Sequence, residues 1–187
     1  MNTFRKSRKG LSTVVTTLII LVVAVLLASI VTFYAINVVT TRVQEESLQI
    51  FKQHIWHNGT TYAEATFLVT NTGGRDVVID KISVRGQESA WSTVYYNKTT
   101  NTVSPDLYYL YPNSNGTLLG KSVTLGLTNY TLVQASDDLI LRSGWSMIVY
   151  ITNPDSISVN DIGVTVSFTV FTANAQWNKE CNVGAAI

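Results

Sequence analysis

The stretch that decides the fold is residues 10–41, GLSTVVTTLIILVVAVLLASIVTFYAINVVTT, where 32 consecutive residues carry no charge. As a helix, residues 11–39 extend roughly 43 Å at 1.5 Å per residue, whereas the hydrocarbon core of a bilayer is about 30 Å thick. Apolar side chains cover every side of the helical projection. Its hydroxyl side chains can bond back to a carbonyl one turn earlier. The stretch therefore predicts a membrane-spanning helix, because a helix apolar all round needs lipid or other apolar helices around it.

The flanks of this stretch predict its orientation. Four basic residues lie within residues 5–9, while Arg42 is followed by Glu45 and Glu46. The excess of basic residues at the start places the N-terminus in the cytoplasm and everything after about residue 45 outside. The apolar stretch is longer than that of a secretory signal peptide, and no small-residue cleavage site follows it. A cut after Gly10 would leave the apolar helix on the mature protein.

The remainder of the chain has the composition of one folded, exported domain. From about residue 59 it is rich in Thr, Val, Asn, Tyr and Ile and has few charges, which favours strands over helices. The single cysteine, Cys181, excludes an internal disulfide and is interpreted as a small buried or loop residue or, alternatively, as an intermolecular bridge. The formal net charge of +1 gives no indication of nucleic-acid binding.

Along the chain, good helix formers continue the predicted helix through residues 42–53, and Asn58-Gly59 ends it. A strand over 62–70, a turn over 71–74 and a returning strand over 77–85 follow. Further strands are predicted at 92–97, 107–111, 122–127, 139–142, 147–152 and 164–170. The fold class is therefore α+β, with a long N-terminal hydrophobic helix over 11–55 and an antiparallel, immunoglobulin-like β-sandwich head over 59–187.

The N-terminal sequence resembles a known family. Arg8-Lys9-Gly10 followed by residues 11–20, LSTVVTTLII, is similar to the class III signal peptide and hydrophobic helix of archaeal type IV pilins, a superfamily that includes the archaellins. Residues 67–79, FLVTNTGGRDVVI, resemble the strand-turn-strand that opens their head domain. The resemblance implies cleavage of residues 1–10 by a prepilin peptidase between Gly10 and Leu11. It also implies export and assembly by a pilus machinery.

Polymerisation is the mechanism that follows from such a helix. Once a helix apolar all round leaves lipid, copies of itself can cover it, and head-to-tail contacts that do not close produce a filament. Small side chains allow close approach between helices. The residues predicted to form this contact are Leu18, Val22, Ala24, Leu26, Ala28 and Phe33. The predicted function is therefore a structural subunit of an extracellular, adhesive archaeal pilus, held in the membrane before it assembles with identical subunits.

Two alternatives to the pilus subunit stay open. Val15 occupies the position of the Glu found in bacterial type IV pilins, which favours an archaeal-type pilin. The Gly-rich start usual in archaellins is absent, so an archaellin of a swimming filament is the less favoured family member. The other alternative is a permanently membrane-anchored binding domain at the cell surface, with sugars as its ligand.

Four Asn-x-Ser/Thr triplets follow the membrane segment and lie near predicted turns. They begin at Asn58, Asn97, Asn115 and Asn129. Because the predicted topology places all four outside the cell, glycosylation of at least one is expected.

Catalysis and metal binding are not expected. His54 and His57, three residues apart near the predicted helix end, would share one helical face, but no Glu or Cys cluster completes a metal site around them. Asp137-Asp138 is interpreted as a solvated turn, with a calcium ligand pair as the alternative. No phosphate-binding loop or hydrolase motif is present in the sequence, so no cofactor is predicted.

Aromatic residues crowd into one part of the head. The set comprises Trp91, Tyr95, Tyr96, Tyr108, Tyr109 and Tyr111. Amphipathic rings suit both a β-sandwich core and a patch that binds sugars or surfaces. Most are expected to pack in the core or between subunits, and a few are hypothesised to face outward and contribute to adhesion.

Overall fold

The computed structural model describes residues 4–43 and 45–186, with side chains for residues 12–41 and 45–186. The chain divides into a helical unit that ends at Val43 and a β unit that follows it. Gly10 and Leu11, the predicted cleavage point, lie in the helical backbone, and their side chains are outside the described residues.

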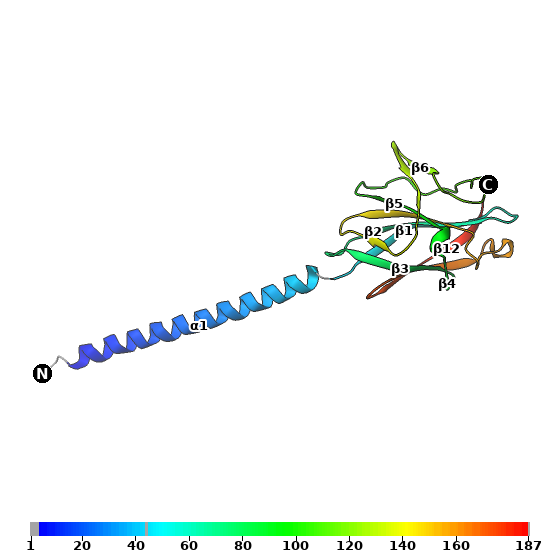
Figure 1. Ribbon diagram of the computed structural model, residues 1–187. Coiled ribbons are helices and arrows are strands. Elements are labelled where there is room, and N and C mark those ends of the chain that lie inside the picture. The colour runs from blue at the N-terminus through cyan, green and yellow to red at the C-terminus, as the bar shows by residue number, and fades with distance from the viewer. Residues whose placement is uncertain (1–3, 44, 187) are drawn as a thin grey trace. The chain divides into compact units, whose positions relative to one another are not determined.

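The helical unit is the single helix α1 (Phe4–Val43), drawn in blue to cyan in Figure 1. Its segment Ser12–Thr41 is long and apolar enough to cross a membrane. As expected, hydroxyls bond back within the helix: Thr16 Oγ1 donates to the Ser12 carbonyl at 2.9 Å, and Ser29 Oγ donates to the Val25 carbonyl at 2.8 Å. These side chains therefore satisfy their own polar groups without an outside partner.

The predicted extension of the helix to residue 55 is wrong. Strand β1 (Leu48–His57) occupies this segment and pairs antiparallel with β2 (Ala63–Asn71). Leu48 and Ile50 point into the core while Gln49 and Phe51 are exposed, which is strand alternation. Pairing with β2 and burial of this face prevail over the local helix propensity of residues 42–53. The β unit therefore begins about fifteen residues earlier than the predicted boundary at 59.

The other elements of the β unit are short strands and two 3₁₀ turns. They are β3 (Val77–Val84), β4 (Gln87–Glu88), η1 (Trp91–Thr93), β5 (Val94–Thr99), β6 (Ser122–Leu125), β7 (Thr128–Thr131), β8 (Val133–Gln134), β9 (Leu139–Leu141), β10 (Ser146–Thr152), η2 (Val159–Asp161), β11 (Thr165–Thr172) and β12 (Gln176–Ala185). The chain is thus α+β, as predicted, with one apolar helix followed by a mainly β domain. An immunoglobulin-like sandwich stays a prediction.

Ten strands form one curled sheet in the order β4-β3-β11-β12-β1-β2-β10-β5-β8, with β9 also on β3, while β6 and β7 form a separate hairpin. All pairs are antiparallel except β1 with β12, which run parallel over Ile55–His57 and 183–185. The predicted hairpin of β2 and β3 does not form, because β2 pairs with β1 and β10 whereas β3 pairs with β11, β4 and β9. Figure 1 shows β2 and β3 as separate arrows of the β unit.

Two apolar clusters stabilise the β unit. The larger one joins side chains from both halves of the sheet, including Phe67 of β2 and Phe168 of β11, whose ring centroids are 5.3 Å apart. The second cluster lies on the other face of β2, β10 and β5, where residues from the segment between β5 and β6 cover Leu68, Ile148 and Tyr150. Strand β2 is therefore buried on both faces, and this second cluster positions the candidate site.

Candidate ligand-binding site

An irregularity in β1 directs two aromatic side chains away from the main core. The register shifts between Phe51 and His54, and Lys52 adopts a left-handed backbone with φ of 52°. A bulge of this kind re-aims the side chains that follow it. His54 and Trp56 remain partly exposed on the outer face, while Ile55 is buried among the core residues.

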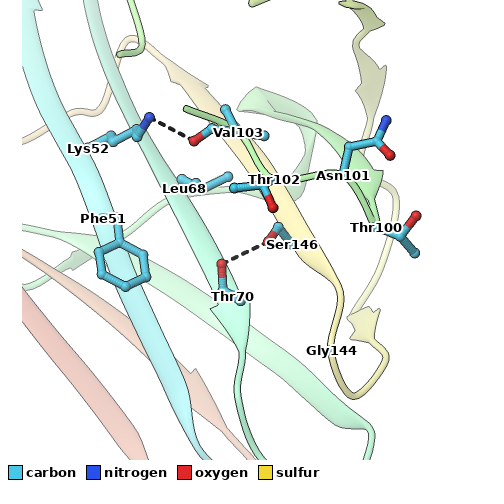
Figure 2. A pocket seen from close by; sticks show the side chains of 10 residues that line it. All are labelled: Phe51, Lys52, Leu68, Thr70, Thr100, Asn101, Thr102, Val103, Gly144 and Ser146. Carbon is cyan, nitrogen blue, oxygen red and sulfur yellow. Dashed lines mark hydrogen bonds between the residues drawn. The ribbon is translucent and has the colours of Figure 1, made fainter. Parts of the chain in front are cut away.

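Lys52 fastens the segment between β5 and β6 onto β1. Its ammonium group donates to the carbonyls of Val103 at 2.8 Å and Ser104 at 2.5 Å and also to the carbonyl of Pro105. Figure 2 shows the lysine reaching across to Val103. Three carbonyls converging on one cation hold this crossing segment and offset the unusual backbone conformation of Lys52.

Beyond that attachment, the crossing segment adds two tyrosines beside the aromatic residues of β1. Leu110 is buried in the second cluster, while Tyr109 and Tyr111 on either side of it face outward. No strand forms over 107–111, contrary to prediction, because its backbone groups bond to side chains instead of a neighbouring strand. The Leu110 N–H donates to Glu64 Oε1 at 2.9 Å, and Tyr150 Oη donates to the Tyr108 carbonyl at 3.0 Å.

These rings form a contiguous cluster, which we name the aromatic platform: His54, Trp56, Tyr109 and Tyr111. His54 stacks on Trp56 with centroids 5.0 Å apart and planes inclined by 17°. Trp56 meets Tyr109 edge-on at 6.2 Å, and Tyr109 meets Tyr111 edge-on at 5.1 Å. These are favoured geometries for aromatic pairs. Tyr111 is 67% exposed, so the platform presents an open ring surface.

A buried carboxyl group holds the segment that carries Tyr109 and Tyr111, because it accepts a hydrogen bond from the Leu110 N–H. Glu64 on β2 is completely buried, and Tyr62 Oη donates to its Oε2 at 3.3 Å. Burial raises the pKa of Glu64 to about 8, although the two hydrogen bonds lower it. Burial, followed by the proximity of Glu64, also raises the pKa of Tyr109. Sequence analysis missed Glu64, and its signal was an isolated acidic residue in the otherwise uncharged run 62–70.

Polar groups adjoin the rings. His54 Nε2 lies 3.0 Å from Asp106 Oδ1, and together with Lys52 these residues line a shallow pocket of about 460 Å³. Lys52 also lines a neighbouring pocket of about 470 Å³, whose lining includes Phe51, Thr70 and Ser146 (Figure 2). The two pockets therefore share Lys52 as a lining residue and lie along β1. The first of them reaches the platform at His54. Exposed rings beside amide, hydroxyl and charged groups suit a ligand with both apolar and hydroxylated faces.

The predicted shared face of His54 and His57 is wrong, because both lie on strand β1. On a strand, His54 and His57 point to opposite faces, and His57 is buried with its Nδ1 accepting from the Gly59 N–H at 3.0 Å. Across the described residues, no three His, Cys, Asp or Glu side chains group to hold a metal ion. Asp137 and Asp138 lie in an exposed turn. Cys181 is a free, partly buried thiol on β12, and burial raises its pKa to about 11.

The four predicted glycosylation residues lie in loops and strands of the β unit. Asn115 is exposed in a turn, and Asn129 is exposed on β7. The Asn58 side-chain oxygen accepts from the N–H groups of residues 60–62. Asn97 Nδ2 already donates to the Thr131 carbonyl at 2.7 Å. Modification of any of the four stays a prediction.

The six residues predicted to form the contact between helices are all exposed on α1. They are Leu18, Val22, Ala24, Leu26, Ala28 and Phe33.

Of the clustered aromatic residues, Tyr95 is buried, whereas Tyr111 faces outward as hypothesised. Tyr111 contacts Tyr109, which in turn contacts Trp56. Trp56 and its stacking partner His54 come from the segment before Asn58-Gly59, where sequence analysis had placed the helix end.

Comparisons with known proteins give little similarity. No family model matches the chain, and no curated protein matches it. A solved structure described as the apo PmoF2 PCuAC domain is similar to this chain, with 14% sequence identity and a TM-score of 0.41. The similarity covers 76% of this chain and 95% of the chain of that structure. Values this low transfer neither a fold nor a ligand to this chain. These comparisons do not bear out the pilin function predicted from the sequence, and we assign the chain no filament-forming role.

Proposed function

We propose that this chain is a membrane-anchored domain that binds carbohydrate on the outer side of the cytoplasmic membrane. The segment Ser12–Thr41 supports the anchor, because it is long and apolar enough to span a bilayer. The basic residues that precede it in the sequence support a cytoplasmic N-terminus and an external β unit.

The observation that carries the binding role is the aromatic platform itself. Large rings are usually buried, so a contiguous cluster of one exposed and three partly exposed rings indicates an interaction surface. Trp and Tyr rings present a flat apolar face and a polar tip, which together match the C–H face and hydroxyl groups of a sugar ring. Contacts from Glu64 and Lys52 hold the crossing segment in place, so little conformational entropy is lost on binding.

The pockets beside β1 favour a ligand of several sugar units. They extend from the Thr70–Ser146 hydroxyl pair, joined at 2.8 Å, past Lys52 to His54. A chain of sugars could lie on the platform and continue beside β1, with hydroxyls and amides of the crossing segment as hydrogen-bonding partners. A single monosaccharide would use only part of this surface.

Isothermal titration calorimetry tests this proposal. The full chain in detergent micelles is titrated with a panel of neutral hexasaccharides that contain glucose, mannose or N-acetylglucosamine units. We expect at least one oligosaccharide to bind, and Trp56→Ala and Tyr111→Ala each to lower its affinity about tenfold because a stacking ring is lost. Phe171→Ala is the matched control, since this half-buried ring on β11 lies outside the platform. No binding across the panel, or unchanged affinity in Trp56→Ala, would refute the proposal.

A further inference from the structure

A third pocket, distinct from the platform and from the two pockets beside β1, is lined by two cationic residues. Its volume is about 350 Å³, and its lining residues are Lys98, Ile140, Arg142 and Trp145. Lys98 belongs to β5, which pairs with β10, whereas Arg142 directly follows β9, which pairs with β3. A strand and a segment that follows another strand, from separate parts of the curled sheet, therefore each contribute one positive charge to the same pocket.

Aromatic rings hold both cations. Lys98 Nζ lies 5.1 Å from the centroid of Tyr96, and Arg142 Cζ lies 5.5 Å from the centroid of Trp145. Such contacts fix the direction of a cation without neutralising it. Lys98 is partly buried and Arg142 is exposed, so the pocket that they line can be reached from solvent.

No carboxylate neutralises this pair within the part of the chain that the structure describes. The ion pairs found there join His54 with Asp106, Arg75 with Glu46, and Arg85 with Asp161. Burial lowers the pKa of Lys98, and the charge of Arg142 lowers it further. Two like charges held near each other without a counter-charge are unfavourable, so an incoming anion would relieve their repulsion.

We propose that this pocket binds the oxyanion group of an acidic sugar derivative, that is, a carboxylate, sulfate or phosphate carried by a ring. The planar fork of Arg142 suits paired oxygens, and Lys98 supplies a second, mobile point charge. Ile140 and the exposed part of Trp145 give the ring an apolar wall. The site uses none of the platform residues, so it stands independently of the neutral-sugar proposal.

The experiment measures binding to the full chain in detergent micelles by calorimetry at low ionic strength. The probes are glucuronate, glucose 6-phosphate and glucose 6-sulfate, with glucose as the neutral match. We expect at least one acidic probe to bind at least tenfold more tightly than glucose, and the three acidic arms identify which oxyanion is preferred. Binding is expected to weaken as salt rises, because screening reduces the attraction.

Variants separate the site from general charge effects. Lys98→Met combined with Arg142→Met keeps the apolar stems and removes both charges, so affinity for the acidic probe is expected to fall at least tenfold. Lys81→Met is the matched control, because Lys81 also stacks on a ring, with Nζ 4.6 Å from the Phe171 centroid. The inference is overturned if no acidic probe binds better than glucose, or if the double variant, with an unchanged near-ultraviolet circular dichroism spectrum, binds as the parent does. Trp56→Ala should leave binding of the acidic probe unchanged. This variant therefore distinguishes failure of the acidic-ligand inference from failure of the carbohydrate-binding proposal for the platform.

Discussion

At the scale of single residues, Glu64 makes the stability of the β unit depend on pH. Its pKa is about 8 in the folded protein, against 4.5 for an ordinary glutamate. Between these values the folded state keeps a proton that the unfolded state has lost, so unfolding releases a proton. Raising the pH from about 4.5 to 8 therefore weakens folding, by at most about 1.4 kcal/mol per pH unit from this group.

The prediction is that the melting temperature of the β unit falls as pH rises from 5 to 8 and that Glu64→Gln largely removes this fall. Glutamine keeps an acceptor for the Leu110 N–H and cannot ionise, so the variant should match the parent best at low pH. Thermal unfolding followed by near-ultraviolet circular dichroism provides the measurement. Glu180→Gln, at an exposed position on β12, is the control and should retain the slope. An identical slope in Glu64→Gln would contradict the assignment.

At the scale of elements, the turn after β2 is hydrogen-bonded to the start of the β unit. The N–H groups of Thr72 and Gly73 both donate to the Ser47 carbonyl, at 2.8 and 3.1 Å. A Cβ atom at Gly73 would lie 2.6 Å from the Glu45 carbonyl oxygen and 2.7 Å from the Ser47 nitrogen. Both are backbone atoms, so they cannot move away as a flexible side chain would.

Gly73→Ala is therefore expected to destabilise the β unit by about 1–3 kcal/mol, the usual cost of an overpacked position. Chemical denaturation of the full chain in micelles, followed by tryptophan fluorescence, measures this difference. Thr72→Ala, which adds no atom at the contact, should cost less. A Gly73→Ala variant as stable as the parent would show that the turn does not press against residues 45–47.

The same segment shows what sequence can predict at this scale. Helix α1 was predictable because its signal is local: an uninterrupted apolar run needs no knowledge of its neighbours. Strand β1 was not, since helix formers such as Glu45 and Gln53 give a local pattern that pairing with β2 overrides. The candidate site divides in the same way, because Tyr109 and Tyr111 are two residues apart in the sequence, whereas Trp56 and Glu64 join them only through non-local pairing and burial.

At the scale of the whole molecule, membrane anchoring depends on the apolar surplus of α1. Seventeen Val, Leu, Ile and Phe residues lie within residues 12–41, and together they favour insertion by about 5–10 kcal/mol at about 0.3–0.6 kcal/mol each. One arginine at the centre of the helix costs about 2.5–3.5 kcal/mol, which this surplus can absorb. Two central arginines, which also remove two leucines, cost about 6–8 kcal/mol and bring the balance near zero.

Leu26→Arg combined with Leu27→Arg is therefore expected to release a large part of the chain from membranes, whereas Leu26→Arg alone stays anchored. Fractionation of cells followed by alkaline carbonate extraction measures the share that remains in the membrane pellet. Thr40→Arg combined with Thr41→Arg adds the same two charges at the end of the segment, where long cationic side chains reach the interface, so it should remain in the pellet. Full retention of the central double variant in the membrane pellet would mean that the apolar segment is not the anchor. The proposed location of the aromatic platform outside the cell, which rests on that segment, would then lose its support.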